Sequence, residues 1–300
     1  MTTRRQKPSN DAGCGPEWRF TRKAGMKYPK LDLDEYRVSS RARFSLKAIR
    51  PDDVQGWDKA AAKARLKENL VALDELQERL YAESERALLI VFQAMDAAGK
   101  DSTIKAVTVG INPQGCSVTN FKAPSTLERA HDFLWRVHLH APPKGMIGIF
   151  NRSHYEDVLI AKVKGLAPAT LIEKRYAHIN HFEQLLVDHG TRILKVMLHI
   201  SPEYQLEQFR DRLKTPSKHW KFNPDDLKER AFWNDYMEAY EKVLRRCSRK
   251  YAPWYVVPAE HKWFRTMVVS ELIRNVLEGM DPRYPAPAFD PDQFDPDSLV

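Results

Sequence analysis

The feature that most constrains the fold is an apolar run at residues 87–92, followed by a loop of small residues that ends in Gly99-Lys100. A short apolar run before such a loop and a helical pattern predicts a buried strand that enters a helix through a tight turn. Backbone N–H groups of the loop and of the helix N-terminus would face an anion, and Lys100 would add a positive charge there. The sequence therefore predicts phosphate binding by Ala97, Ala98, Gly99, Lys100, Asp101, Ser102 and Thr103.

The loop departs at two positions from the pattern G-x-x-x-x-G-K-[ST]. Ala94 stands in place of the first glycine, and Asp101 stands in place of the serine or threonine, with Ser102 and Thr103 directly behind it. An ordinary strand-to-helix turn with an exposed lysine would show the same letters. Asp96 favours the phosphate interpretation, because a carboxylate beside a phosphate needs a cation between them. We therefore predict that Asp96 binds Mg²⁺, for which Mn²⁺ could substitute.

Composition favours a globular protein without export or membrane segments. The 300 residues are 43% hydrophobic, which suits one large domain with extensions. No run of about 18 uncharged apolar residues occurs, and the N-terminus lacks the apolar stretch of a secretory signal, so we expect a cytoplasmic protein with no membrane partner. Cys14, Cys116 and Cys247 are widely spaced, which predicts neither a disulfide framework nor a zinc site.

The positive charge is concentrated near the N-terminus. The net charge is +8, and residues 1–50 hold 13 Lys and Arg against 5 Asp and Glu, so this segment contributes the whole excess. Such an arm attracts polyanions over a long range, although a solvated leader would have the same composition. We predict a basic N-terminal extension at 1–50, with no specific nucleic-acid partner, and a C-terminal tail at 282–300 that is rich in Pro and Asp.

Between these ends, short apolar runs alternate with helical patterns. Apolar residues recur at every third or fourth position over 59–83, which predicts an amphipathic helix before the first strand. This alternation predicts an α/β fold over residues 51–281, with a mainly parallel sheet, helices on both faces, and strand-end loops that meet at one crevice. Strands are expected at 87–92, 117–121, 146–150, 192–200 and 254–258, and further helices near 101–111, 125–138, 154–164, 177–189, 202–213, 225–250 and 261–278.

Polar residues follow two other expected strands. Asn151 and Arg152 come directly after the strand at 146–150. Asn151 can coordinate a cation or position a water, and Arg152 can hold phosphoryl oxygens in a bidentate manner. Lys122 follows the strand at 117–121 and would face the same crevice. The alternatives are a turn with a surface ion pair for Asn151 and Arg152, and a solvated charge for Lys122.

A basic stretch at about 202–225 has the composition of a lid. Closure over bound phosphates would exclude water, which matters where hydrolysis competes with transfer. The alternative is a charged helix face, and we expect the aromatic residues Trp220 and Phe222 to pack on the core. The cations of this stretch are Arg210, Arg212, Lys214, Lys218 and Lys221.

Seven short segments, in colinear order, together resemble one family. Over residues 36–281 the chain resembles the second family of polyphosphate kinases, the polyphosphate:nucleotide phosphotransferases. Its Asn-Arg-Ser sequence at 151–153 resembles the subgroup that accepts nucleoside mono- and diphosphates. The segments are Met95–Lys100 (Met-Asp-Ala-Ala-Gly-Lys), Asn112–Cys116, Phe121–Ser125, Asp132–Arg136, Ile147–Ser153, Trp220–Phe222 and Ala252–Val256.

The resemblance implies a P-loop kinase-like three-layer α/β/α sandwich with a helical lid. It also implies Mg²⁺-dependent, reversible phosphoryl transfer between inorganic polyphosphate and AMP or ADP, with guanine nucleotides as a further option, in a homo-oligomer. The catalytic candidates are then Asp96, Lys100, Asn151 and Arg152, and the phosphate-binding candidates are residues 97–103 with Lys122, Arg210, Arg212, Lys218 and Lys221. An ATP-dependent nucleoside-monophosphate kinase and a non-enzymatic polyanion-binding module remain as alternatives.

Overall fold

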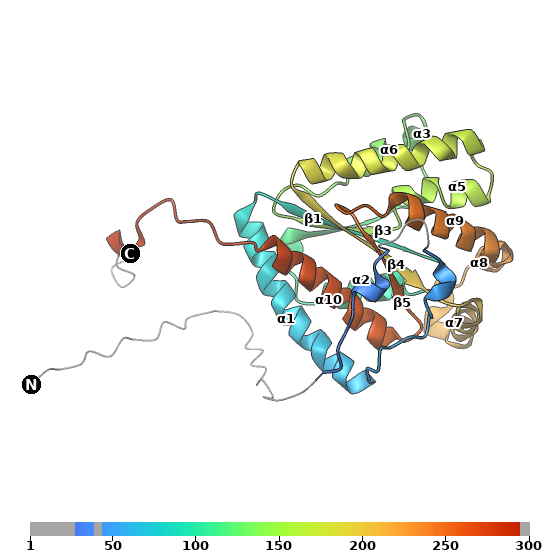
Figure 1. The fold of residues 1–300 in the computed structure, drawn as a ribbon, viewed down its shortest axis with the longest axis horizontal. Coiled ribbons are helices and arrows are strands. Elements are labelled where there is room, and N and C mark those ends of the chain that lie inside the picture. Colours follow the sequence, from blue (N-terminus) through green and yellow to red (C-terminus); the bar gives the residue numbers. More distant parts are fainter. Residues whose placement is uncertain (1–27, 39–43, 295–300) are drawn as a thin grey trace, which may run out of the picture.

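A five-stranded, wholly parallel sheet lies at the centre of the molecule (Figure 1). The structure, a computed structural model, describes residues 28–38 and 44–294. The strand order is β2-β3-β1-β4-β5, and every residue of the central strand β1 is buried. All five expected strands are confirmed, with their ends shifted by two residues at most. They are β1 (Ala87–Ala94), β2 (Cys116–Asn120), β3 (Ile147–Asn151), β4 (Thr191–His199) and β5 (Trp254–Pro258).

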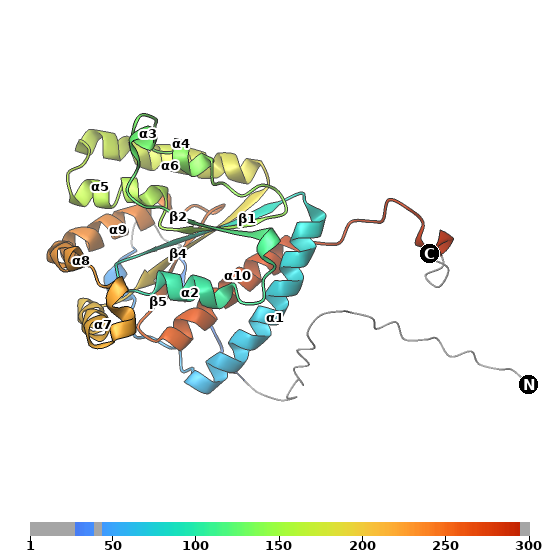
Figure 2. The ribbon, with the colours of Figure 1, turned by 180° about the vertical axis from the view of Figure 1, so that it is seen from behind.

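Helices cover both faces of the sheet, which confirms the three-layer sandwich (Figures 1 and 2). One face is covered by α1 (Lys59–Glu83), α2 (Lys100–Val107) and α10 (Lys262–Met280). The other face is covered by α6 (Ala169–Asp188) and α9 (Trp233–Cys247), together with the short helices α3 (Thr126–Arg129), α4 (Trp135–His138) and α5 (Ile160–Val163). None of the helices in the described ranges has the length and apolar content that crossing a bilayer requires.

Helix α1 has the bounds that its periodicity predicts. Its first turn is capped by Asp58, whose carboxylate accepts from the N–H groups of Ala60 and Ala61. Leu73 and Leu80 are fully buried on the side that packs along α10. An amphipathic face therefore holds α1 on the sheet layer, because burial of the leucines drives the packing.

Several helix boundaries differ from the expected ones. The segment 125–138 divides into α3 and α4, because Asp132 accepts from the N–H of Leu134 and starts a new turn. The long helix expected at 225–250 divides into α8 (Pro224–Glu229) and α9, with a 3₁₀ turn between them. Helix α6 begins at Ala169, directly after Pro168, and not near 177; the earlier start buries Ile172 and Tyr176.

The described part of the expected N-terminal extension packs on the domain. Tyr36, Val38 and Leu46 belong to the hydrophobic core, and the N–H of Val38 donates to the carbonyl of Trp254 in β5 at 2.9 Å. This part therefore contributes to the fold, while residues 1–27 and 39–43 of the expected extension lie outside the described residues. At the other end, residues 283–294 are exposed and run away from the sheet in Figure 1.

Candidate active site

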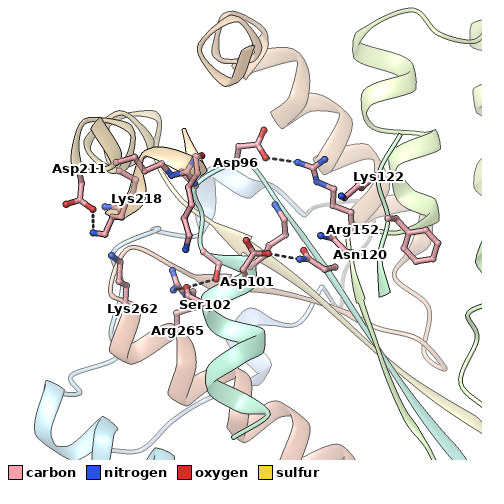
Figure 3. Close-up of a pocket in the computed structure, with 18 residues that line it drawn as sticks. Asp96, Asp101, Ser102, Asn120, Lys122, Arg152, Asp211, Lys218, Lys262 and Arg265 are labelled. Atoms are coloured by element: carbon pink, nitrogen blue, oxygen red, sulfur yellow. Dashed lines mark hydrogen bonds and ion pairs between the residues drawn. The ribbon is translucent and has the colours of Figure 1, made fainter. Parts of the chain in front are cut away.

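A cavity of about 400 Å³ opens where β1, β2 and β3 end (Figure 3). We call it the cationic cavity, because eight lysines and arginines line it against three aspartates. Such a wall attracts polyanions. The cations are Lys100, Lys122, Arg152, Arg212, Lys218, Lys221, Lys262 and Arg265, and the carboxylates are Asp96, Asp101 and Asp211.

The backbone of the loop between β1 and α2 explains why glycine is not needed at position 94 and is required at position 99. Ala94 ends β1 as ordinary strand, so that position does not need glycine. Positive φ occurs instead at Ala97 (64°) and Gly99 (96°). A Cβ at Gly99 would lie 2.5 Å from Nη1 of the buried Arg265, so both the backbone angle and the space require glycine there.

Lys100 begins α2 and lies in the wall of the cationic cavity. Its Nζ donates to the carbonyl oxygen of Ala94 at 2.8 Å, which ties the ammonium to the end of β1. Burial lowers the pKa of Lys100, although the neighbouring Asp96 carboxylate opposes that shift. A phosphate at this place would add negative charge beside the buried ammonium.

Asp96 and Arg152 meet across the cavity from β1 and β3. Arg152 Nη2 lies 2.9 Å from Asp96 Oδ1, and Gln205 donates to the backbone carbonyl of Asp96 at 3.0 Å. Glu156 is half-buried close by. Burial raises its pKa above the ordinary value, and the positive charges of Arg152 and Lys100 offset this only in part. Arg152 adopts a φ of 63°, an angle that an L-residue adopts at a cost, so the local structure holds its side chain in this position.

Asn151 and Lys122 complete the wall on the β2–β3 side. Asn151 Nδ2 donates to Asp101 Oδ1 at 2.6 Å, so the amide oxygen is the group left to accept a hydrogen bond or bind a cation. The carbonyl of Lys122 accepts from Arg136 Nη1 at 2.8 Å, and this guanidinium also lies over the Phe121 ring. Arg136 therefore fixes the backbone that presents Lys122.

Sequence reasoning missed the wall that α10 contributes. Arg265 Nη1 donates to Ala98 O at 2.7 Å and to Ala259 O at 3.0 Å, and its Nη2 donates to Ser102 Oγ at 3.0 Å. Lys262 lies one turn before it; burial lowers the pKa of Lys262, and the cations Arg265 and Lys218 lower it further. A usable signal was present, because α10 follows β5 and so begins at the same sheet edge as the phosphate loop.

The basic stretch at 202–225 borders the cavity through part of its cations. It comprises α7 (Pro202–Lys214) and the 3₁₀ helix η5 (Pro216–Lys221), and runs into α8. Arg212, Lys218 and Lys221 line the cavity, as does Gln208, which the sequence reasoning did not single out. Lys218 pairs with Asp211 at 2.6 Å (Figure 3).

Some expected residues lie elsewhere. Arg210 is exposed and does not line the cavity, because it lies two positions from Arg212 and so on a different side of α7. Ala98 and Thr103 are buried behind the loop, where Thr103 Oγ1 donates to Gly99 O and stabilises the turn. Trp220, expected to pack on the core, is 80% exposed, whereas Phe222 contacts Phe209; η5 lies along the cavity and directs only part of its side chains inward.

Comparison with known proteins gives consistent results. Residues 56–285 match the family described as Polyphosphate kinase 2. The chain is 48% identical over 257 residues to the AMP/ADP-polyphosphate phosphotransferase of Meiothermus ruber, covering 85% of this chain and 96% of that protein. It is 45% identical over 232 residues to the ADP-polyphosphate phosphotransferase of Rhodopseudomonas palustris, with 73% and 80% covered. The crystal structure of Polyphosphate Kinase 2 from Arthrobacter aurescens TC1 superposes with a TM-score of 0.86 at 43% identity, covering 90% of this chain and 97% of that one.

Proposed function

Because this chain belongs to the polyphosphate kinase 2 family, we propose that it transfers a phosphoryl group between inorganic polyphosphate and the nucleotides AMP and ADP. The protein is thus an enzyme, a transferase of the kinase class. The observation that supports this function most directly is the cationic cavity, which combines a phosphate-loop turn with a carboxylate and cations from five sheet-edge segments. A cavity of this charge suits two phosphate-bearing substrates that must meet.

The cavity has two ends with the phosphate loop between them (Figure 3). Lys218, Lys262 and Arg265 lie at one end, and Lys122, Arg152 and Asn120 lie at the other, with Asp96 and Asp101 in the middle. We assign polyphosphate to the end formed by α7, η5 and α10, where cations predominate. We assign the nucleotide phosphates to the other end, where an amide and a strand-end lysine accompany Arg152. The two substrates then face each other at Asp96 and Lys100.

Phosphoryl transfer requires that the protein align the two substrates and neutralise their negative charge, and it requires no covalent bond to the protein. Lys100, Lys122 and Arg152 would hold phosphoryl oxygens, and the ordered loop amides would stabilise the negative charge that spreads over the transferred group. The ion pair between Asp96 and Arg152 uses one nitrogen and one oxygen, so each group keeps further atoms that could contact substrate. Segments around η5 would exclude water from the transfer, since hydrolysis is the competing reaction.

Asp96 is our candidate for holding Mg²⁺. Within residues 28–38 and 44–294, no three His, Cys, Asp or Glu side chains are grouped so that they could hold a metal ion. Mg²⁺ commonly takes only one or two protein carboxylates, together with phosphate oxygens and waters. Asp96, a partly exposed carboxylate beside the phosphate loop and one of three aspartates in the cationic cavity, fits that pattern. When bound, the ion would supply positive charge between the reacting phosphates.

The decisive experiment is a nucleotide panel without ATP. Purified protein would be incubated with Mg²⁺, polyphosphate and each nucleoside mono- or diphosphate in turn, and products would be followed over time. We expect ADP from AMP, ATP from ADP, or both. Product from AMP only when ATP replaces polyphosphate would identify an ATP-dependent nucleoside-monophosphate kinase and contradict the proposal. The base preference, the oligomeric assembly and the cytoplasmic location stay predictions.

A further inference from the structure

A second groove, of about 580 Å³, adjoins the cationic cavity. We call it the outer groove; it lies between the first turns of α1 and α10 and the neighbouring parts of α2 and α7. The two hollows share Gln208 and Lys262 in their walls, so they are direct neighbours on the surface. A chain molecule that fills the end of the cationic cavity at Lys262 can therefore extend into the outer groove.

The rim of the outer groove is positively charged. Lys59 and Lys63 lie one helical turn apart on α1, about 6 Å along its axis. Both are exposed, and neither makes a hydrogen bond or ion pair with another described residue. Cations are unfavourable at the N-terminal end of a helix, where the helix dipole is positive. The helix dipole therefore does not stabilise these two lysines, whereas an anion bound at this point would.

The carboxylates near the rim are already engaged. Asp58 accepts from the N–H groups at the start of α1. Glu260 accepts from the N–H of Ser201 at 2.9 Å and from its hydroxyl at 2.5 Å, and so holds the start of α7. Neither carboxylate makes an ion pair with Lys59 or Lys63. The carboxylates in the described part of the chain therefore leave the positive charge of the rim unneutralised.

Lys262 joins the two hollows within a cluster of cations. Arg265 and Lys218 lie close enough to lower its pKa in addition to the effect of burial. The floor of the outer groove is apolar because Leu66, Tyr204 and Trp263 pack against the hydrophobic core. Packing accounts for the floor, whereas no carboxylate among residues 28–38 and 44–294 pairs with Lys59 or Lys63 on the rim.

We propose that the outer groove binds the distal phosphates of the polyphosphate chain, with Lys59 and Lys63 as their contacts. The inference rests on the proposed function and deepens it by assigning a path to the part of the donor that does not react. Charge complementarity and the shared wall with the cationic cavity identify a linear polyphosphate as the occupant. Because these phosphates lie away from the reacting atoms, the groove raises affinity for long chains and leaves the turnover of bound substrate unchanged.

The test compares donor chain lengths in matched charge variants. We would measure kcat and KM for tripolyphosphate and for long-chain polyphosphate, at saturating nucleotide, in the wild type and in the double variant Lys59→Ala/Lys63→Ala. Loss of two exposed ionic contacts should raise KM for the long chain about fivefold, with kcat and the KM for tripolyphosphate unchanged. The control is Lys144→Ala/Lys174→Ala, which removes two exposed lysines that line neither hollow and pair with none of the residues that the structure describes.

Four results would overturn the inference: an unchanged KM for the long chain, an equal change at both chain lengths, the same change in the control variant, or a change confined to the nucleotide KM. The last would indicate that a nucleoside occupies the groove. If the wild type makes no product from polyphosphate, the proposed function itself fails. Equilibrium binding of long-chain polyphosphate, measured without nucleotide, would still decide the outer groove, and thermal unfolding would verify that the variants are folded.

Discussion

The buried ion pair between Lys195 and Glu183 offers a sharp test of how the site is supported. Both side chains are fully buried, and Lys195 Nζ lies 2.5 Å from Glu183 Oε2. The ammonium also donates to Tyr155 Oη at 3.0 Å and to Cys247 O at 2.8 Å, and the Tyr155 hydroxyl donates to Glu183 Oε1 at 2.6 Å. Tyr155 follows Arg152 by three residues, so this network anchors the segment that presents Arg152.

We expect Lys195→Met to lower the free energy of unfolding by about 3–5 kcal/mol, the usual cost of leaving one partner of a buried pair unpaired. The double variant Lys195→Met/Glu183→Gln should recover most of that loss, to within about 1–2 kcal/mol of the wild type, because no uncompensated charge then remains. Urea unfolding, followed by fluorescence and circular dichroism, measures both differences. The double variant is the control that separates charge from packing.

The free energy of unfolding changes with pH in a direction that can be derived for the wild type and for Lys195→Met. Burial raises the pKa of Glu183, but Lys195 and His154 outweigh it and hold that pKa below its ordinary value. Glu183 therefore stabilises the wild-type fold at pH values above its ordinary pKa, and this contribution is lost as pH falls through the lowered pKa. In Lys195→Met the burial effect dominates, so the Glu183 pKa rises above its unfolded value and the variant gains stability as pH falls.

The stability gap between the wild type and Lys195→Met should therefore narrow from about pH 7 to about pH 5. Lys195 is the one titratable group that the substitution removes, so the difference between the two proteins reports on Glu183 together with the groups that contact it, His154 and Tyr155. A gap below about 1 kcal/mol at pH 7, or one that widens as the pH falls, would refute the reasoning. Equal losses in the single and double variants would do the same, because they would assign the effect to packing alone.

Three further predictions concern the site itself. Asp96→Asn and Lys100→Ala should each lower kcat by about 10²-fold or more with the fold intact, and near-normal turnover in steady-state assays would contradict their roles. Gly99→Ala should lower the free energy of unfolding by about 2–4 kcal/mol, because it adds a strained φ and displaces the buried Arg265 guanidinium. The control is Gly110→Ala, where φ is similar but the space is open. We expect this control to lose only about 1–2 kcal/mol, measured by the same urea unfolding. Arg136→Met should raise the KM for the nucleotide more than it lowers kcat, because it frees the Lys122 backbone; an unchanged nucleotide KM would exclude this positioning role.

Much of the fold could be predicted because its signals are local. The apolar run at 87–92, the leucine spacing of α1 and the alternation of runs each depend on periods that packing enforces. The split of 125–138 and the early start of α6 could not be predicted, because side-chain caps and the burial of Ile172 and Tyr176 decide them. Tertiary contacts therefore set the helix ends.

The site residues also fall into those that the sequence predicts and those that depend on tertiary contacts. Asp96, Lys100, Asn151 and Arg152 follow strands, so the rule that parallel strands end at one edge brings them together. For Arg265 the sequence offered only its place in the helix after β5; its contact with the phosphate loop depends on a distant glycine, whose missing Cβ leaves space for the guanidinium. Arg210, predicted to bind phosphate, does not line the cavity, since composition alone does not say which side of a helix faces inward.

The short segment at Arg37 and Val38 also matters for how molecules meet one another. Its bridge to Tyr255 and its hydrogen bond to Trp254 shield part of the outer margin of β5. An unshielded strand margin offers a template for pairing with another chain. A shortened protein that begins after this segment would expose that margin and aggregate, which light scattering would detect. Any truncation made for crystallisation should therefore retain Arg37 and Val38.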